Sequence, residues 1–178
     1  MANNFIMILN TTIGIQTIIY KDQVLTVNLE DELKPIMKID TDGTKRWYLN
    51  DKLHRLDGPA VEHSNGSKHW YFEGNLHRLD GPAIEWHNGN KYWYVEDKLH
   101  RLDGPAVEYS NGSKYWYFEG KLHRVGGPAV EHSNGFKYWY FEGNLHRLDG
   151  PALEEYDNGK LKRLEKWIDG KKISSMEF

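Results

Sequence analysis

The peptide Leu-His-Arg-Leu-Asp-Gly-Pro-Ala begins at Leu53, Leu76, Leu99 and Leu145, and a variant with Val-Gly in place of Leu-Asp begins at Leu122. The interval between copies is always 23 residues. Self-similarity at a fixed period marks a repeat architecture, in which each unit buries its apolar surface against its neighbours. This period constrains the fold more strongly than any local propensity.

The repeat divides the chain into three regions. Five units fill the middle of the chain, at 43–65, 66–88, 89–111, 112–134 and 135–158. Residues 1–42 do not repeat; segments 5–9, 15–20, 23–29 and 35–39 of this region are expected to be short strands. Repeat arrays need covered ends, so residues 1–42 are predicted to cap one end and residues 159–178, a degenerate sixth unit with Trp167 and a turn at Asp169-Gly170, the other.

Each unit contains two turn signals and no helical periodicity. Asn-Gly recurs once per unit, and we expect a two-residue type I′ turn there because both central residues would have positive φ. Counting outward from Asn88-Gly89 places Glu85 opposite Tyr92 and Ile84 opposite Trp93. A second reversal is expected at Glu73-Gly74 and its equivalents. The prediction is an all-β, elongated and curved antiparallel meander of β-hairpin repeats.

This register separates two faces of the sheet. Trp93, Val95, Ile84 and Pro82 would share one face, which we predict to be the core, and Leu76 and Leu79 would fold back over the indole rings. The opposite face would carry Tyr92, Tyr94, Glu96, Ala83 and Glu85. Aromatic side chains dominate interface energetics, so a water-facing tyrosine surface would be a binding surface.

The 23-residue period, the glycine turns, the Trp/Tyr strand and the histidine in the following loop resemble MORN-type repeats. The likeness covers residues 43–158 and is nearest to the variant with Leu-His-Arg-x-Asp-Gly-Pro-Ala of bacteriophage and giant-virus proteins. This chain has His54-Arg55-Leu56-Asp57-Gly58 where the standard family has His-Gly-x-Gly. The resemblance implies an elongated β-sheet scaffold that sometimes dimerises, and membrane-lipid binding has been proposed for that family.

Composition excludes several classes of protein. The chain has no cysteine, which rules out disulfides and thiolate chemistry. Its 23 Lys+Arg against 26 Asp+Glu argue against a nucleic-acid binder, which needs a basic excess. The N-terminal segment lacks a basic region and no stretch has the roughly 18 apolar residues of a membrane span, so a cytoplasmic protein without membrane contact is expected.

The histidine in each loop does not predict an active site. Equivalent residues two strands apart are separated by about 10 Å, too far for neighbouring histidines to share one metal ion. We therefore predict no catalytic residues, no metal site and no cofactor. The alternative role is structural: Arg78 would hydrogen-bond Asp80 or loop carbonyls, and Gly81 would supply an unusual backbone angle before Pro82.

The sequence thus predicts a non-catalytic binding protein, and its viral resemblance points to an inhibitor of a host defence protein. The partner-binding residues would be His69, Tyr71, Trp86, Tyr92, Tyr94, Tyr115, Tyr117, Phe136, Tyr138 and Tyr140. An alternative is sequestration of a nucleotide-like or phosphorylated small molecule by His77, Arg78, His100, Arg101, His123 and Arg124. Homodimerisation or assembly into a larger structure is a further expectation, because sheet edges invite self-association.

Overall fold

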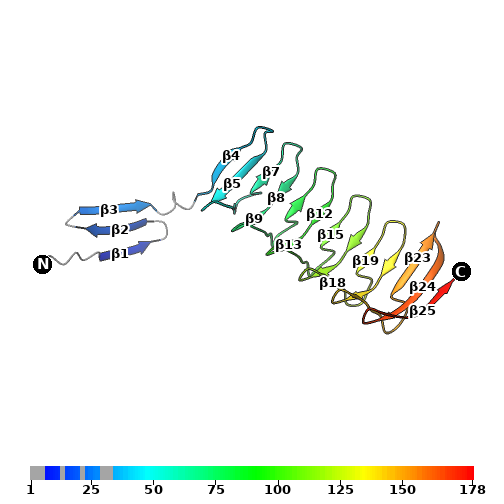
Figure 1. Cartoon of the computed structure of the whole chain (residues 1–178). Helices are drawn as coiled ribbons and strands as arrows, with labels where there is room; N and C mark the ends of the chain where they lie inside the picture. Colours follow the sequence, from blue (N-terminus) through cyan, green and yellow to red (C-terminus); the bar gives the residue numbers. More distant parts are fainter. Residues whose placement is uncertain (1–6, 13–14, 21–22, 29–33) are drawn as a thin grey trace.

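The computed structural model describes residues 7–12, 15–20, 23–28 and 34–178, and every regular element in these residues is a β-strand (Figure 1). Strands β1 (Met7–Thr12), β2 (Ile15–Tyr20) and β3 (Gln23–Asn28) form a three-stranded antiparallel sheet. The predicted all-β antiparallel meander is confirmed. Residues 5, 6 and 29 of the expected strands lie outside the described residues.

A 14-stranded antiparallel sheet runs from β4 to the end of the chain, following the order of the sequence. It starts with β4 (Ile36–Ile39) paired with β5 (Lys45–Leu49), so that Met37 lies opposite Trp47. Each following unit adds two short strands to it. These are β7 (Val61–Glu62), β8 (Lys68–His69), β11 (Ile84–Glu85), β12 (Lys91–Tyr92), β15 (Val107–Glu108), β16 (Lys114–Tyr115), β19 (Val130–Glu131) and β20 (Lys137–Tyr138).

The other half of each unit forms a second row of hairpins. They comprise β9 (Tyr71–Phe72) with β10 (Asn75–Leu76), β13 (Tyr94–Val95) with β14 (Lys98–Leu99), β17 (Tyr117–Phe118) with β18 (Lys121–Leu122), and β21 (Tyr140–Phe141) with β22 (Asn144–Leu145), while β6 (Lys52–Leu53) pairs with β5. Backbone bonds join successive hairpins, such as Gly74 N to Leu53 O at 2.9 Å.

The tryptophan of each unit connects the two rows. Trp70 donates its backbone N–H to the Ala83 carbonyl at 2.8 Å, and its own carbonyl accepts from His77 N at 3.1 Å. One residue therefore bonds to the main sheet on one side and to the hairpin row on the other. Because the same pair of bonds recurs at Trp47, Trp93, Trp116 and Trp139, the two rows stay in step along the array.

The turn predicted at Asn-Gly is wrong inside the array. Trp86 N donates to Asn90 O at 3.0 Å and Gly89 N to Trp86 O at 2.9 Å, so three residues, not two, connect the strands. Only the glycine has positive φ, +89° at Gly89, and the Asn88 side chain accepts from Asn90 N at 3.1 Å. This is the three-residue hairpin with a glycine bulge. The positive-φ pairs lie instead at the second reversal, with φ of 49° at Glu73 and 91° at Gly74.

The extra turn residue shifts the register by one. Ile84 lies opposite Tyr92 and Glu85 opposite Lys91, so the predicted pairs Ile84–Trp93 and Glu85–Tyr92 are wrong. A one-residue shift exchanges the faces of the returning strand. Ile84 therefore shares a face with the tyrosines, and the tryptophans share theirs with Ala83, which is 0% exposed and not the water-facing residue that we expected.

The core consists of small and branched aliphatic side chains. Its residues are Ala60, Val61, Ala83, Ile84, Ala106, Val107, Ala129, Val130, Ala152 and Leu153. Each Val, Ile or Leu of this set is paired in the sheet with the tyrosine or histidine of a neighbouring strand, as Val107 is with Tyr92 and Tyr115. The predicted core of Trp93, Val95 and Pro82 is wrong in that all three are only half-buried.

Charged side chains of alternating sign cross the opposite face. Lys91 pairs with Glu85 on one side and with Glu108 on the other, and the pattern continues at Lys114 and Glu131. Opposite charges directly across antiparallel strands stabilise the pairing. This row therefore helps to fix the alignment of each unit on the next.

The C-terminal strands β23 (Leu153–Asp157), β24 (Lys160–Ile168) and β25 (Lys171–Glu177) complete the sheet. Asp169 and Gly170 do form a turn with positive φ, 46° and 74°. The backbone carbonyl of Trp167, however, accepts a hydrogen bond from Arg147 N at 3.1 Å. In the preceding unit the carbonyl of Tyr140 accepts the equivalent bond from Arg124 N. Trp167 therefore occupies a tyrosine position and not the tryptophan position that its type suggests.

Candidate functional site: grooves between the arginine loops

A stack of tryptophan and arginine side chains forms one side of the array. The guanidinium carbon of each loop arginine lies over the indole of its own unit, eight residues earlier in the chain. The distances are 4.1 Å for Arg55 on Trp47, Arg78 on Trp70 and Arg101 on Trp93, 3.8 Å for Arg124 on Trp116, and 4.2 Å for Arg147 on Trp139. Such cation–π contacts each contribute about 0.5–2 kcal/mol, depending on burial.

Each arginine also makes several hydrogen bonds. Arg78 Nε donates to Asp80 Oδ1 at 2.8 Å, and its Nη1 donates to the Pro82 carbonyl at 3.2 Å and to Glu85 Oε1 at 3.3 Å. The prediction that Arg78 bonds Asp80 and a loop carbonyl is confirmed. The hydrogen bond and charge of Arg78 also lower the pKa of the Asp80 carboxyl. Arg124 has no such aspartate, because glycine occupies position 126, and it bonds Pro128 and Glu131.

The loop glycine is required by close approach. A Cβ built on Gly81 would lie 2.9 Å from Cζ of Arg78, and the value is 2.9–3.0 Å for Gly58, Gly104, Gly127 and Gly150. These five glycines do not have positive φ, so the predicted unusual backbone angle at Gly81 is wrong. The guanidinium lies between the indole and the glycine, and a side chain there would displace it.

The loop histidines cap the turn of the next unit. His54 Nδ1 accepts from Glu73 N at 3.1 Å, and the same bond joins His100 to Glu119 and His123 to Glu142 at 3.2 Å. Their rings alternate with phenylalanines along the array, with centroids 4.8 Å apart for His100 and Phe118. His146 makes the equivalent bond with Asp169 N at 3.2 Å, and the ring of His77 lies 5.9 Å from that of Phe72.

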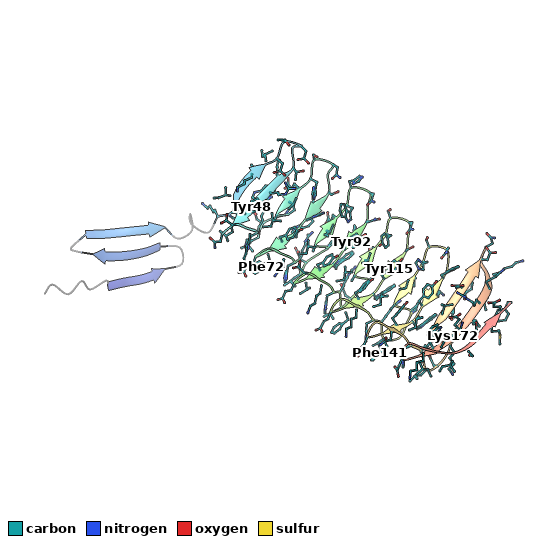
Figure 2. All side chains as sticks on the ribbon, in the orientation of Figure 1. Tyr48, Phe72, Tyr92, Tyr115, Phe141 and Lys172 are labelled. Atoms are coloured by element: carbon teal, nitrogen blue, oxygen red, sulfur yellow. The ribbon has the colours of Figure 1, made fainter. Side chains whose placement is uncertain are left out.

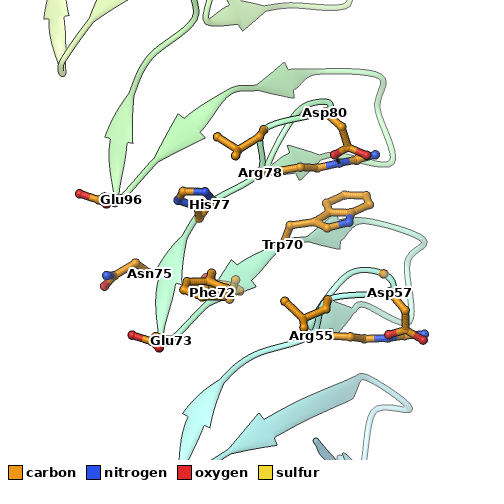
Figure 3. Close-up of a pocket in the computed structure, with 14 residues that line it drawn as sticks. Arg55, Asp57, Trp70, Phe72, Glu73, Asn75, His77, Arg78, Asp80 and Glu96 are labelled. Carbon is orange, nitrogen blue, oxygen red and sulfur yellow. Dashed lines mark hydrogen bonds and ion pairs between the residues drawn. The ribbon is translucent and has the colours of Figure 1, made fainter. Parts of the chain in front are cut away.

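Four open grooves separate the successive arginine loops. The first, between the loops of Arg55 and Arg78, has a volume of about 820 Å³, and the others have about 610, 480 and 420 Å³. In the first groove Trp70, Phe72 and His77 lie in the middle, with Asp57 and Asp80 toward one end and Glu73 and Glu96 toward the other (Figure 3).

Exposed apolar side chains lie at the loop tips on either side of these grooves and between them. The loop-tip side chains Leu56, Leu79, Leu102, Val125 and Leu148 are 79%, 81%, 82%, 81% and 70% exposed, and Phe72, Phe118 and Phe141 between them are 42%, 43% and 45% exposed. We call these eight residues the apolar stripe. Leu79 does not fold over the indole rings, so that prediction is wrong.

The stripe was missed at the sequence level. Its signal was an aliphatic residue at the same loop position of every unit, including Val125, whose neighbour Gly126 differs from the aspartate of the other units. Nothing in the turn geometry requires an aliphatic side chain there. A repeated leucine is ordinarily assigned to a core, which concealed its exposure.

The predicted partner-binding tyrosines are half-buried and form two rows. Tyr71, Tyr117 and Tyr140 line the grooves beside the tryptophans. Tyr92 and Tyr115 (Figure 2), with Tyr138, share the face of the buried aliphatic residues instead. The row of His69, Tyr92, Tyr115 and Tyr138 alternates with the buried aliphatic row. Burial raises the pKa of Tyr71, Tyr94, Tyr117 and Tyr140, and it raises that of Tyr92 to about 12.

Further rings lie between these tyrosines. Tyr109 packs 6.0 Å from Tyr92 and 5.4 Å from Tyr115, and Trp86 lies 5.1 Å from His69. Phe136 is half-buried beside the fourth Asn-Gly turn. Desolvation, with the nearby His63, lowers the pKa of His69 to about 4. The structure thus brings the predicted partner-binding residues together, but much of their surface packs within the array.

The histidines and arginines of the alternative ligand site line the grooves. The first groove contains His77 and Arg78, the second His100 and Arg101, and the third His123 and Arg124, while Arg124 also lines the fourth. Their hydrogen-bonding groups are largely engaged within the array. The sequence therefore located the grooves, but assigned them to polar residues rather than to the apolar stripe.

Comparisons with known proteins gave no match, either to a protein-family model or to a curated protein. Within the described residues, no helix is long and apolar enough to cross a membrane.

Proposed function

We propose that this chain is a non-catalytic binding protein whose repeat array holds a protein partner along the apolar stripe. The observation that carries the proposal is the exposure of Leu56, Leu79, Leu102 and Val125 at about four-fifths of their surface, with one such residue in each of these units. Each neighbouring pair lines a common groove. Contiguous exposed apolar patches of this kind mark interaction sites, whereas isolated exposed leucines do not.

The fixed roles of the loop polar groups support binding over catalysis. A catalytic site needs a nucleophile, base or acid free to reach a substrate. Here His100 Nδ1 accepts from the backbone of the next unit, and Arg101 is held by Asp103, Pro105 and Glu108. The arginine bonds recur in all five loops, and these groups already serve the fold.

Sequestration of a phosphorylated small molecule is the weaker proposal for the same reason. An anion entering a groove would compete with the carboxylates that already bond each arginine, such as Asp80 and Glu85 at Arg78. The resemblance to repeats of bacteriophage and giant-virus proteins extends the leading proposal to a cytoplasmic inhibitor of a host defence protein.

The test is capture of partner proteins from cells of the natural host by three forms of the full chain. We expect Leu79→Ser with Leu102→Ser to lose at least about 90% of a protein that the wild type retains, since burying each leucine contributes about 1.5–3 kcal/mol. The control is Ile173→Ser with Met176→Ser, which removes two exposed apolar residues from β25 outside the stripe. Equal capture by all three forms would refute the proposal.

A further inference from the structure

The apolar stripe has a spacing that discriminates between partner conformations. Equivalent loop tips lie two strands apart, and strands in a sheet are about 4.8 Å apart, so the tips recur every ~10 Å. An extended strand presents side chains on one face every ~6.6 Å or ~13 Å, which does not match. A helix advances 1.5 Å per residue, so residues seven apart recur at about 10.5 Å on nearly the same face.

The stripe is flanked by acidic side chains on both sides. Asp57, Asp80, Asp103 and Asp149 follow the loop tips and are 82%, 83%, 83% and 83% exposed. Glu73, Glu96, Glu119 and Glu142, at the turns of the hairpin row, are also exposed. Lys52, Lys98 and Lys121 lie against the glycines of neighbouring turns, so this second margin is mixed in charge, with carboxylates in excess. Figure 3 shows both kinds in one groove, with Asp57 and Asp80 at the end opposite Glu73 and Glu96.

The positive charges of the first groove are already neutralised. Arg55 bonds Asp57 and Glu62, Arg78 bonds Asp80 and Glu85, and no lysine lines this groove. A partner lying over it meets exposed leucine and phenylalanine in the middle and carboxylates at both margins. Charge complementarity therefore favours a partner with basic flanks.

We propose that the apolar stripe binds an amphipathic α-helix with apolar residues in a heptad pattern and lysine or arginine along both flanks. Its apolar residues enter successive grooves between the loop tips, and its basic flanks face the Asp and Glu rows. This inference rests on the proposed function and adds the chemistry of the partner. The spacing and the two acidic margins carry it together.

The test uses a fluorescent synthetic 28-residue peptide with leucine at the a and d positions of four heptads and lysine at e and g. We expect fluorescence anisotropy to show saturable binding to the full chain, weakened at least about 20-fold by Leu79→Ser with Leu102→Ser. The Ile173→Ser, Met176→Ser control binds as the wild type does. Reversing two margin charges with Glu73→Lys and Glu96→Lys weakens binding about 10-fold and reduces its salt dependence.

Three results would overturn the inference. They are equal binding of a peptide with glutamate in place of lysine, equal binding of a peptide whose helix is broken by central prolines, and self-association of the chain through Leu79 and Leu102 in light scattering. If cellular capture depends on Leu79 and Leu102 but the basic helical peptide does not bind, the proposed function stands and the helical partner is wrong. If neither capture nor peptide binding depends on these leucines, both fail.

Discussion

The two sides of the array differ in how strictly they repeat. On the tryptophan side, all five units have Trp, Arg, Gly and Pro in the same contacts, and the arginine-to-indole distance varies only from 3.8 to 4.2 Å. The tyrosine side is the face that carries the row of His69, Tyr92, Tyr115 and Tyr138. There, the neighbouring row of His63, Trp86, Tyr109 and His132 changes from unit to unit. Ring-to-ring packing accepts rings of different size, whereas a guanidinium between an indole and a glycine has one geometry.

Breaking the stack on the tryptophan side should have the largest effect. We expect Arg101→Ala to lower the free energy of unfolding by about 2 kcal/mol, because it removes the stack on Trp93 and the bond to the Pro105 carbonyl. Gly104→Ala should cost about 1–2 kcal/mol by overpacking, since its Cβ would lie 2.9 Å from the Arg101 guanidinium carbon. Urea denaturation measures both.

The double variant Arg101→Ala with Gly104→Ala sharpens this prediction. When Arg101 is already alanine, nothing of the guanidinium remains for the new methyl group to meet, so Gly104→Ala should cost almost nothing. Simple additivity of the two substitutions would contradict the steric role of the glycine. It would point instead to a backbone requirement at position 104.

On the tyrosine side, the first unit of the row has His69 where later units have tyrosine. This difference should make the stability of the fold depend on pH. The pKa of His69 is lowered to about 4 in the folded chain against about 6.5 unfolded, so the unfolded state binds the proton first as the pH falls. The stability that neutral His69 contributes is complete above about pH 6.5 and is lost progressively toward pH 4. Below that, protonation of the arginine-paired aspartates removes further stability.

His69→Tyr tests this window, because Tyr92, Tyr115 and Tyr138 occupy the same position in the following units. We expect the urea midpoint of the variant to fall less than that of the wild type between pH 7 and pH 4.5. His87→Gln, at an exposed histidine, serves as the matched control for the loss of a histidine. Parallel pH profiles for wild type and His69→Tyr would show that the histidine is not the source.

The smallest effect is expected at the fourth loop, the one place where the tryptophan side departs from its pattern. Gly126→Asp would return the aspartate that Arg55, Arg78, Arg101 and Arg147 each bond in their own loops. Exposed ion pairs contribute little, so the thermal midpoint should rise only slightly, and less in high salt. A clear loss of stability would mean that the loop needs the positive φ of +80° at Gly126.

The sequence predicted the class of fold and the repeat, because period and turn residues are local signals. The faces were misassigned through one dipeptide. Asn-Gly suits both a two-residue turn with two positive φ values and a three-residue turn in which only glycine has one. Asn158-Gly159 takes the first form, with φ of 47° and 77°, and Asn88-Gly89 takes the second. The deciding contact, Asn88 Oδ1 with Asn90 N, exists only in the folded loop.

The candidate site was only partly predictable for a different reason. The bonds of Arg78 to Asp80 and the loop carbonyl followed from residue chemistry and are confirmed. The exposure of Leu79 did not follow, because hydrophobicity gives no information on which side of a loop a leucine leaves the chain. That direction is set by the stack beneath the loop, where Arg78 already covers the indole of Trp70.

The hydrogen bonds that join one unit to the next have an evolutionary consequence. Arg78 N to Tyr94 O, Arg101 N to Tyr117 O and Arg124 N to Tyr140 O are the same bond at successive junctions. Unequal recombination that removes or duplicates 23 codons would rejoin matching surfaces and leave both chain ends intact. Evolution can thus lengthen or shorten the array, and with it the apolar stripe, in steps of about 10 Å. Each new junction between units would use the same hydrogen bonds as the existing ones.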